Sequence, residues 1–454
     1  MDRYDRQLRL WGHGGQALLT KSTVCLIGPN SCLLQEIWKI LVLAGQRNFI
    51  WVIEDGNEID DNQFFYDDIV RDLSALHPQG IIVEKKESLC DIEWVKLSVV
   101  ILANSSNKYY LETLSMEEVK LHLPPVFTAY VHGMVGYLHL SLSEPYFVME
   151  SHPDNVVPEL RLDKPWPELV KYMESFDLKS MDEYSLAKLP YPVILYHAII
   201  YIKEIMGINP ATLTSSQFRG YLTHYIHELS PGNVNDLNFI EAKRFSYLAL
   251  PNPTLQKKLE SVIDYAKQSY NLCTDEYNRN VSILLQTLEI YLKENANNHY
   301  PLPARIPDME SSTEEFNKIK MVYEGENMKS LDRLMELLQE NKYDIPKSLL
   351  EVFCDNIKNI QYQEPSTYSI ERSLFNTSNR LLRDLLELQY GSANNIKMDE
   401  HMEKVLSLNS YPTSTFIGGV VAQETIKLIT HQYIPINNTF LFDASKNEST
   451  ILRL

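Results

Sequence analysis

The chain has 454 residues, 44% hydrophobic and 22% charged, which is long enough for roughly two to four globular domains. Its net charge of −18 argues against a nucleic-acid-binding surface and against attraction to an anionic membrane, because both require clustered Lys and Arg. It shows no apolar run of about 18 residues and no N-terminal apolar segment, so we expect neither membrane spanning nor secretion.

Arginines are concentrated near the start of the chain. The run Arg3-Tyr-Asp-Arg-Gln-Leu-Arg-Leu-Trp-Gly12 places three arginines and two aromatic residues at helical spacing. These arginines either pair with the nearby Asp2 and Asp5 on a solvated helix, or one of them is presented to phosphate, whose oxygens a guanidinium binds in a forked geometry. Composition alone leaves both interpretations open.

A strand–helix–strand unit follows. Apolar runs at 23–28 and 49–55 predict two buried strands, and the periodicity of 33–44 predicts the helix between them. In nucleotide-binding folds, several glycines at the first strand–helix junction let backbone N–H groups approach phosphate. Here only Gly28 remains. Pro29 removes one N–H donor, and side chains at 30–33 would crowd a phosphate, so the sequence predicts a nucleotide-binding fold without its ligand.

Asp55 has two interpretations. It ends the second predicted strand, where dinucleotide-binding folds place an acid that binds ribose. Asp55-Gly56 is also a favourable turn dipeptide. We favour the turn, because the glycine loop that would accompany a ribose-binding acid is missing.

The character of the chain changes twice. Residues 1–165 are α/β in pattern, with a short apolar run at 97–103 and a hairpin-like alternation over 126–142. Long amphipathic stretches predict a helical domain over 166–395; they are Val193–Met206, Leu255–Tyr270, Ser282–Asn295 and Ser312–Leu338. Residues 396–454 return to α/β with an apolar helix at 416–430 and a strand at 438–443. The order predicts one α/β domain interrupted by a large helical insertion.

Other reactive side chains carry weaker signals. His224 and His227 are three residues apart on a predicted helix, but no third ligand has suitable spacing, so we expect no metal site. The five cysteines are odd in number, scattered and without a CxxC pair, which is typical of reduced thiols in a cytosolic or nuclear protein. Cys354 could act as a nucleophile by residue type only, and a buried structural thiol is the favoured interpretation.

Several stretches resemble a known family. They are Tyr4–Gly12, Glu150–Asn155 with Leu160–Leu169, Pro307–Thr313, and Gly418–Thr430 with Tyr433–Ile436. Together they resemble the regulatory, catalytically inactive subunits (amyloid-precursor-protein-binding type) of heterodimeric activating enzymes for Nedd/Rub-type ubiquitin-like modifiers, over nearly the whole chain. The first and last stretches are shared with the corresponding subunit of the SUMO-type enzyme, whereas the middle stretches select the Nedd/Rub branch.

The resemblance implies a fold and a division of labour. The fold would be a Rossmann-like, ThiF/MoeB-type adenylation pseudo-domain, and the helical insertion would correspond to the catalytic-cysteine domain of active relatives without its cysteine. A catalytic subunit would bind ATP and Mg, adenylate the modifier's C-terminus and carry the modifier as a cysteine thioester. Active relatives hold magnesium with an acid after the strand at 97–103, and 97–111 contains none.

For this chain the same resemblance implies no bound cofactor, no bound metal and no catalysis on its own. Its partners would be the catalytic subunit and the modifier, with no nucleic acid and no membrane, in the cytoplasm or nucleus. Arg6 would reach across to ATP held by the catalytic subunit.

Alternatives from other classes remain. The chain could be the SUMO-type subunit, a self-sufficient adenylyltransferase or dehydrogenase with a degenerate loop, or a non-catalytic scaffold. Pro29 and Leu33 argue against the self-sufficient enzyme, and a dispensable Arg6 would favour the scaffold. The apolar helix at 416–430 fits either a buried dimer face or a core helix under the sheet.

Overall fold

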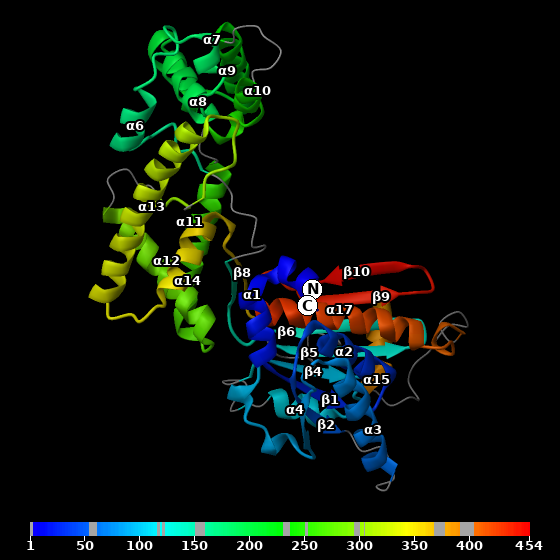
Figure 1. The fold of residues 1–454 in the computed structure, drawn as a ribbon. Helices are drawn as coiled ribbons and strands as arrows, with labels where there is room; N and C mark the ends of the chain where they lie inside the picture. The colour runs from blue at the N-terminus through cyan, green and yellow to red at the C-terminus, as the bar shows by residue number, and fades with distance from the viewer. Residues whose placement is uncertain are drawn as a thin grey trace. The chain divides into compact units, whose positions relative to one another are not determined.

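The computed structural model describes residues 3–53, 61–115, 119, 123–149, 159–229, 237–249, 253–294, 300–303, 305–366, 377–390 and 404–454. The chain forms two compact units: one comprises 1–154, 271–279 and 361–454, and the other comprises 155–270 and 280–360 (Figure 1). Asp55, the stretch Glu150–Asn155 and the predicted boundary at 395/396 lie outside the described residues. No helix in the described ranges combines the length and apolarity needed to cross a membrane.

The first unit is α/β. Its elements are α1 (Asp5–Lys21), β1 (Thr23–Gly28), α2 (Cys32–Ala44), β2 (Asn48–Ile53), α3 (Asp61–Leu76), β3 (Ile82–Lys86), η1 (Leu89–Asp91), η2 (Trp94–Lys96), β4 (Val99–Ala103), α4 (Lys108–Ser115), β5 (Val126–His132), β6 (Val135–Ser141), β7 (Tyr146–Val148), β8 (Gln361–Gln363), α15 (Arg380–Tyr390), α17 (Tyr411–Thr430), β9 (Thr439–Asp443) and β10 (Glu448–Leu452).

Eight strands form the main sheet in the order β10-β9-β6-β5-β4-β1-β2-β3. The strands β3, β2, β1, β4 and β5 are parallel, whereas β6, β9 and β10 are antiparallel additions. The strand order reverses between β1 and β4. In doubly wound sheets, ligands bind beyond the carboxyl ends of the strands at such a reversal, so a nucleotide site would lie beside the ends of β1 and β4.

Helices cover both faces of this sheet. On one face, α2 and α17 pack together over side chains such as Val24, Leu26 and Ile101. On the other face, α4 and α15 pack over Cys25 and Ile27. Alternation along β1 thus places successive side chains in two separate cores, and this double burial explains why the strand is apolar throughout.

The second unit is helical. Its elements are α6 (Pro167–Met173), α7 (Glu183–Leu186), α8 (Tyr191–Ile200), the π-helix η3 (Tyr201–Ile205), η4 (Pro210–Thr212), α9 (Ser215–Leu229), α10 (Leu237–Arg244), η5 (Ser246–Leu248), α11 (Pro253–Ser269), α13 (Thr313–Glu340), α14 (Lys347–Asn356) and η7 (Ile357–Asn359). Two elements, η6 (Tyr270–Leu272) and α12 (Glu276–Glu294), begin in one unit and end in the other. α8 is buried on nearly all sides and lies at the centre of the helical core.

Most of the elements predicted from the sequence are present in the structure. The predicted strand, helix and strand at 23–28, 33–44 and 49–55 correspond to β1, α2 and β2, and the predicted hairpin corresponds to β5 and β6. The α/β fold class with a helical insertion is confirmed. The units and the predicted domains have different limits, because α15 is an amphipathic helix that packs on the sheet and 271–279 also belong to the α/β unit.

The apolar helix at 416–430 is α17, which starts earlier, at Tyr411. Its inner residues Ile417, Val421 and Ala422 are fully buried in the core with α2, so the core-helix interpretation is confirmed for this face. Gly418 allows the close packing, because a Cβ there would stand 3.1 Å from the Cβ of Glu36. Phe416, in contrast, is 45% exposed, so the edge of the helix that carries it is open to a partner.

Candidate functional site

The loop after β1 keeps its one glycine for a structural reason. Gly28 has φ of +141°, and a Cβ at this position would stand 2.3 Å from the carbonyl oxygen of Ala103 at the end of β4. Any side chain here would clash with the backbone of the neighbouring strand. Gly28 is therefore required by the contact between β1 and β4, whether or not a phosphate binds.

The N-terminus of α2 is capped by its own sequence. The Oγ of Ser31 accepts a hydrogen bond from the N–H of Leu34 at 3.3 Å, and the side chain of Gln35 donates to Oδ1 of Asn30 at 2.7 Å. Leu33 and Leu34 are fully buried in the core. A phosphate-binding loop leaves the first N–H groups of the helix open to the ligand, whereas here a side chain occupies one of them.

The end of β4 is closed by a polar network. Asn104, which follows the strand, accepts a hydrogen bond from the N–H of Val131 at 2.9 Å through Oδ1. The next residue, Ser105, is buried, and its carbonyl oxygen accepts from Nε2 of Gln389 on α15 at 2.8 Å. Tyr137 of β6 donates its hydroxyl to Oε1 of the same glutamine at 2.5 Å.

Burial keeps this network in one protonation state. It raises the pKa of the Tyr137 hydroxyl well above its ordinary value, with a further contribution from Tyr390, so Tyr137 remains a donor. Through Gln389, the helix α15 is hydrogen-bonded beside the end of β4, next to the place where a doubly wound sheet would hold a nucleotide. Sequence reasoning missed this residue, Gln389, because it assigned 380–390 to the helical domain.

The three N-terminal arginines have different environments. Arg9 forms an ion pair with Asp5 at 3.0 Å, one turn away, so the local-pairing interpretation holds for Arg9. Arg3 donates to the carbonyl oxygen of Leu76 at the end of α3, at 2.5 Å. Arg6 is exposed and has no hydrogen bond or ion pair within the described ranges. Asp2 lies outside those ranges.

The first turn of α1 is held to the C-terminal end of α2. Gln7 donates to the carbonyl oxygen of Leu43 at 3.4 Å, and Gln16 donates to that of Ala44 at 3.0 Å. Gly12, with φ of 67°, kinks the helix between these two contacts. Arg6 is the neighbour of Gln7, so it lies at this end of α2. The degenerate loop lies at the other end of α2, which has 13 residues, about 20 Å away.

Four of the five cysteines are poorly suited to carry a modifier as a thioester. Burial raises the pKa of Cys354 and Cys25, and it raises the pKa of Cys273 to about 12. Burial and the neighbouring Glu36 also raise the pKa of Cys32. A nucleophilic cysteine requires a lowered pKa, so these four thiols are disfavoured as acceptors. For Cys354, the interpretation as a buried structural thiol is confirmed.

The two histidines of α9 are both exposed. Nε2 of His224 lies 3.3 Å from a carboxylate oxygen of Glu228, one turn away. Across the described residues, no group of three or more His, Cys, Asp or Glu side chains is arranged to hold a metal ion.

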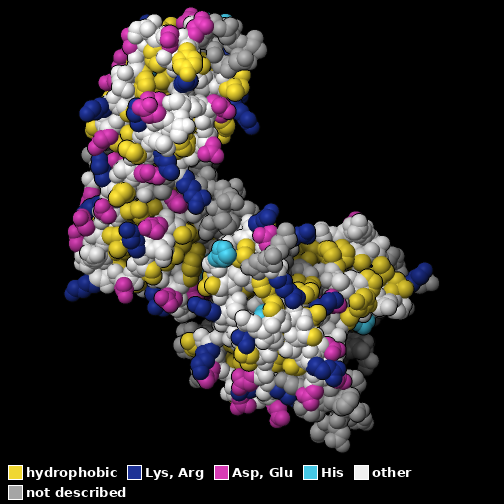
Figure 2. Space-filling model, in the orientation of Figure 1, with side chains coloured by type: hydrophobic (Ala, Val, Ile, Leu, Met, Phe, Trp, Pro, Cys, Tyr) yellow, Lys and Arg dark blue, Asp and Glu magenta, His cyan; other side chains and the backbone are white. Residues whose placement is uncertain are grey.

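An exposed aromatic surface lies at the edge of the same unit. The ring of Phe416 lies 4.3 Å from that of Phe442 and 6.3 Å from that of Phe440. Ile451 of β10 pairs directly with Phe440 and is 61% exposed, so it shares the same face of the sheet. We call these four residues the Phe416 surface; hydrophobic side chains gather over this part of the molecule in Figure 2.

The fold and the site define a class: a doubly wound, Rossmann-like α/β domain interrupted by a helical insertion and lacking the glycine loop of nucleotide-binding relatives. Comparisons with known proteins specify the family. No family model matches the chain. The NEDD8-activating enzyme E1 regulatory subunit of Saccharomyces cerevisiae is 34% identical over the whole of both chains. The subunits of the same name from Danio rerio and, as AXR1, from Arabidopsis thaliana are 26% and 22% identical over the whole chain and 98% and 96% of their own lengths.

This chain belongs to the family of NEDD8-activating enzyme E1 regulatory subunits. The predicted Nedd/Rub branch is confirmed, and the SUMO-type alternative is not favoured. As a regulatory subunit, the chain is not catalytic alone. Among solved structures, E. coli MccB with succinimide aligns with 31% of this chain and 49% of its own at a TM-score of 0.24 and 14% identity. That likeness is too weak to bear on the fold, which is defined by the strand order.

Proposed function

We propose that this chain is the non-catalytic half of a heterodimeric NEDD8-activating enzyme and supplies Arg6 to ATP bound by the catalytic subunit. The observation that carries the proposal is the position of Arg6, which is exposed, has no partner within the described ranges, and lies at the opposite end of α2 from the chain's own loop. An arginine there cannot reach a phosphate at Gly28, so any phosphate that it meets belongs to another molecule.

The proposed reaction of the heterodimer determines what Arg6 would do. An oxygen of the modifier's C-terminal carboxylate attacks the α-phosphorus of ATP, the bond from that phosphorus to the bridging oxygen breaks, and pyrophosphate leaves. A cysteine of the catalytic subunit then attacks the acyl carbon and AMP leaves, which gives the thioester. Negative charge grows on the departing phosphates, so a guanidinium positioned beforehand lowers the barrier.

The neighbours of Arg6 hold its backbone in place. Arg3 is bonded to the end of α3 and Gln7 to the end of α2, so the turn that carries Arg6 is anchored on both sides. Neither anchor uses the Arg6 side chain. The guanidinium is therefore free to bind phosphate oxygens with little reorganisation of the protein, as an arginine finger in trans requires.

The Phe416 surface is the proposed contact with the catalytic subunit. Phe416 and Ile451 are exposed, and aromatic and aliphatic clusters of this kind are typical of obligate heterodimer interfaces. The loop lacks all but one of its glycines, and Ser31 caps one of the helix N–H donors, so we propose that the chain binds neither ATP nor Mg and leaves both to the partner. We propose a cytoplasmic or nuclear location, which cell fractionation would test.

The test compares Arg6→Ala with Arg9→Ala in reconstituted heterodimers. Arg9 is a matched control, because it lies one turn away on the same helix and pairs with Asp5. We expect Arg6→Ala to lower modifier-dependent pyrophosphate exchange on the order of 10³-fold and Arg9→Ala to leave it nearly unchanged. Arg6→Lys should give an intermediate rate, since lysine keeps the charge and loses the fork.

Size-exclusion chromatography of each complex separates catalysis from assembly. We expect both alanine variants to elute as intact heterodimers. A normal exchange rate with Arg6→Ala would reject the proposed role and favour a scaffold. Loss of the heterodimer would instead identify Arg6 as an interface residue.

A further inference from the structure

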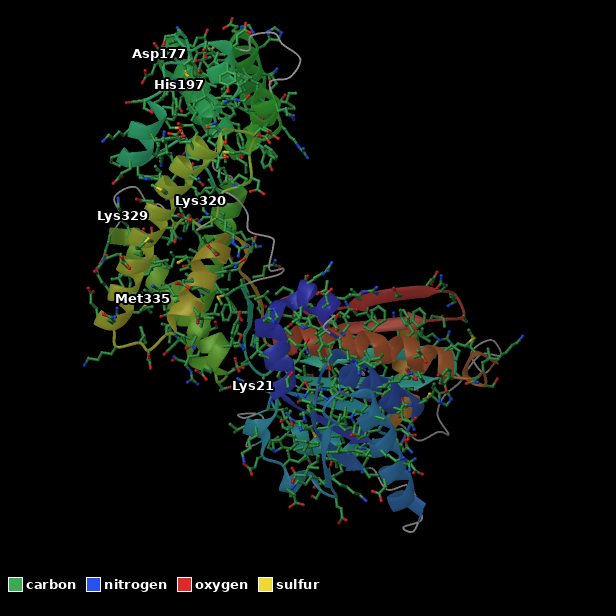
Figure 3. The ribbon with its side chains drawn as sticks, viewed as in Figure 1. Lys21, Asp177, His197, Lys320, Lys329 and Met335 are labelled. Carbon is green, nitrogen blue, oxygen red and sulfur yellow. The ribbon has the colours of Figure 1, made fainter. Side chains whose placement is uncertain are left out.

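The helix α13 has two distinct faces. Its buried face packs into the helical unit and consists of Ile319, Tyr323, Asn327, Ser330, Leu334, Leu337 and Leu338. The opposite face carries Met321, Met328 and Met335, each seven residues from the next, or about 10 Å along the axis. Figure 3 labels Met335 on α13, in the turns that follow Lys320 and Lys329. The three methionines thus form one stripe along the outer side of a 28-residue helix.

The stripe is exposed and is interrupted by a glycine. Met321 is 67% exposed and Met328 is 62% exposed, whereas Met335 is half-buried. Between the first two lies Gly325, where an added Cβ would meet nothing within 4 Å. No packing contact requires glycine here, and glycine destabilises a helix relative to alanine. Its effect on the surface is to leave a depression between two flexible, polarisable side chains.

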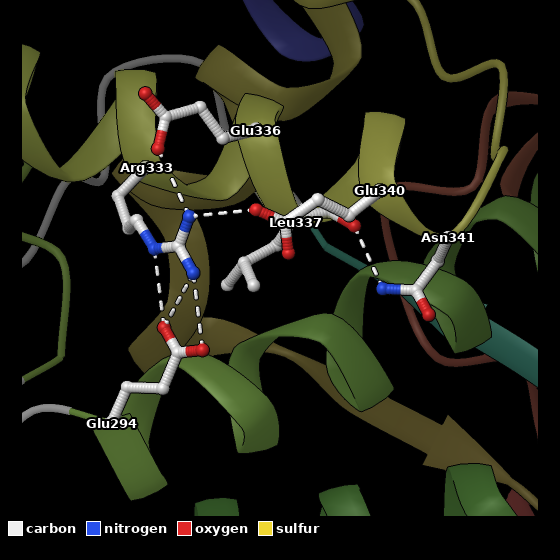
Figure 4. A network of polar contacts seen from close by, with 6 residues as sticks. All are labelled: Glu294, Arg333, Glu336, Leu337, Glu340 and Asn341. Carbon is white, nitrogen blue, oxygen red and sulfur yellow. Dashed lines mark hydrogen bonds and ion pairs between the residues drawn. The ribbon is translucent and has the colours of Figure 1, made fainter.

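The margin of the stripe is acidic. α13 carries seven acidic and four basic side chains. Near Met335, Arg333 is shared among three carboxylates: its guanidinium bonds to Glu294 at 2.9–3.1 Å, to Glu336 at 2.9 Å and to Glu340 at 3.1 Å (Figure 4). One positive charge among three negative charges leaves an excess of two negative charges.

The lysines of this helix do not reverse the excess. Lys318 pairs with Glu314 and Glu315, Lys320 pairs with Glu324, and Lys329 pairs with Glu168 and Glu326. Asp332, which is exposed on the same side as the stripe, adds a further negative charge. A binding partner with positive side chains would therefore be attracted to the Met335 end of the stripe.

We propose that Met321, Met328 and Met335 form a docking stripe for a basic amphipathic helix of another protein. Methionine-rich faces adapt to apolar helices, and the seven-residue spacing matches the apolar positions of a helix lying alongside. The charge excludes two other occupants. A second copy of this chain would bring a net charge of −18 and the same acidic helix, and an anionic membrane would be repelled.

The test uses the full chain and a synthetic probe. The probe is a fluorescein-labelled peptide of leucine and lysine with its leucines on one helical face. Its controls are a shuffled peptide of the same composition and a leucine–glutamate peptide of the same pattern. Fluorescence anisotropy is measured with the wild type, with Met321→Gln/Met328→Gln, and with Met206→Gln, an exposed methionine outside α13. Glutamine is a good helix former, so the double variant should keep its circular dichroism spectrum.

We expect saturable binding of the leucine–lysine peptide that weakens with salt, and about tenfold weaker binding to the double variant. The Met206→Gln variant should bind like the wild type, and both control peptides should fail to bind. Equal binding by the double variant or by the shuffled peptide would overturn the proposal, as would the absence of saturable binding to the wild type. Self-association that the double variant abolishes would also overturn it, because the occupant would then be a second copy.

Discussion

Nε2 of Gln389 donates to the carbonyl oxygen of Ser105 at 2.8 Å and so fixes α15 beside the residues that follow β4. The place where a nucleotide would bind therefore differs from an active site in two respects. It lacks the glycines of the loop, and a side-chain network lies beside the end of β4. We expect that Pro29→Gly/Asn30→Gly, which rebuilds part of the glycine loop at positions that are not buried, gives no ATP binding by the isolated chain.

Isothermal titration calorimetry checks this expectation. The heterodimer with its catalytic subunit provides the positive control, since the partner is proposed to bind ATP. Micromolar binding of ATP to the isolated loop variant would contradict the role of Gln389 and Ser31. The glycines would then be the main difference from an active site.

The second prediction concerns Gly28. Gly28→Ala should lower the free energy of unfolding by about 2–4 kcal/mol, because alanine is strained at φ of +141° and its Cβ would stand 2.3 Å from the oxygen of Ala103. Gly14→Ala is the matched control. Gly14 lies in α1 with nothing within 4 Å of an added Cβ, so this variant should be more stable by about 0.5–1 kcal/mol. Urea unfolding that shows equal effects of the two substitutions would refute the close-contact argument.

Local pattern was sufficient for elements whose packing follows from their own sequence. β1 and β4 are short apolar runs because both of their faces are buried, and α17 is apolar because it packs against both the sheet and α2. α15 was misassigned for the opposite reason. Its amphipathic pattern shows that one face is buried but not what buries it, and the Tyr137 contact of Gln389 spans 252 positions in the sequence.

The arginines illustrate the same limit at the candidate site. Sequence spacing predicts the pair of Arg9 with Asp5, because residues four apart face each other on a helix. It cannot predict that Arg3 binds a backbone carbonyl of α3, since that oxygen is brought near only by folding. Of the three arginines, Arg6 alone has no hydrogen bond or ion pair within the described ranges, and spacing cannot show this because the partners of the others depend partly on tertiary structure.

The third prediction concerns pH. His139 is buried in β6, its Nδ1 lies 2.7 Å from the hydroxyl of Thr439, and burial lowers its pKa to about 4. The unfolded chain protonates this histidine near pH 6.5, so between pH 6.5 and 4 the unfolded state binds more protons than the folded state. The contribution of His139 to the free energy of unfolding is therefore fully present above pH 6.5. It is lost on acidification towards pH 4, and its size is on the order of 3 kcal/mol.

His139→Gln should reduce the slope of unfolding free energy against pH in this window, measured by urea unfolding at several pH values. It should not abolish the slope, because burial also lowers the pKa of His77, His197 and His431. His224→Gln, at an exposed site on α9, provides the comparison with a histidine outside the core. An unchanged slope for His139→Gln would show that this histidine is not buried in its neutral form.

The fourth prediction tests the Phe416 surface as the contact with the catalytic subunit. Phe416→Ser/Ile451→Ser removes two exposed side chains and should leave the fold intact, since neither belongs to the buried core. Losing an aromatic and an aliphatic contact should weaken the heterodimer at least about tenfold, measured by calorimetric titration of one subunit into the other. The matched control is Ile82→Ser on β3, at the other edge of the same sheet and 53% exposed. If Ile82→Ser weakens assembly as much as the double substitution does, the interface lies elsewhere and the Phe416 surface requires another partner.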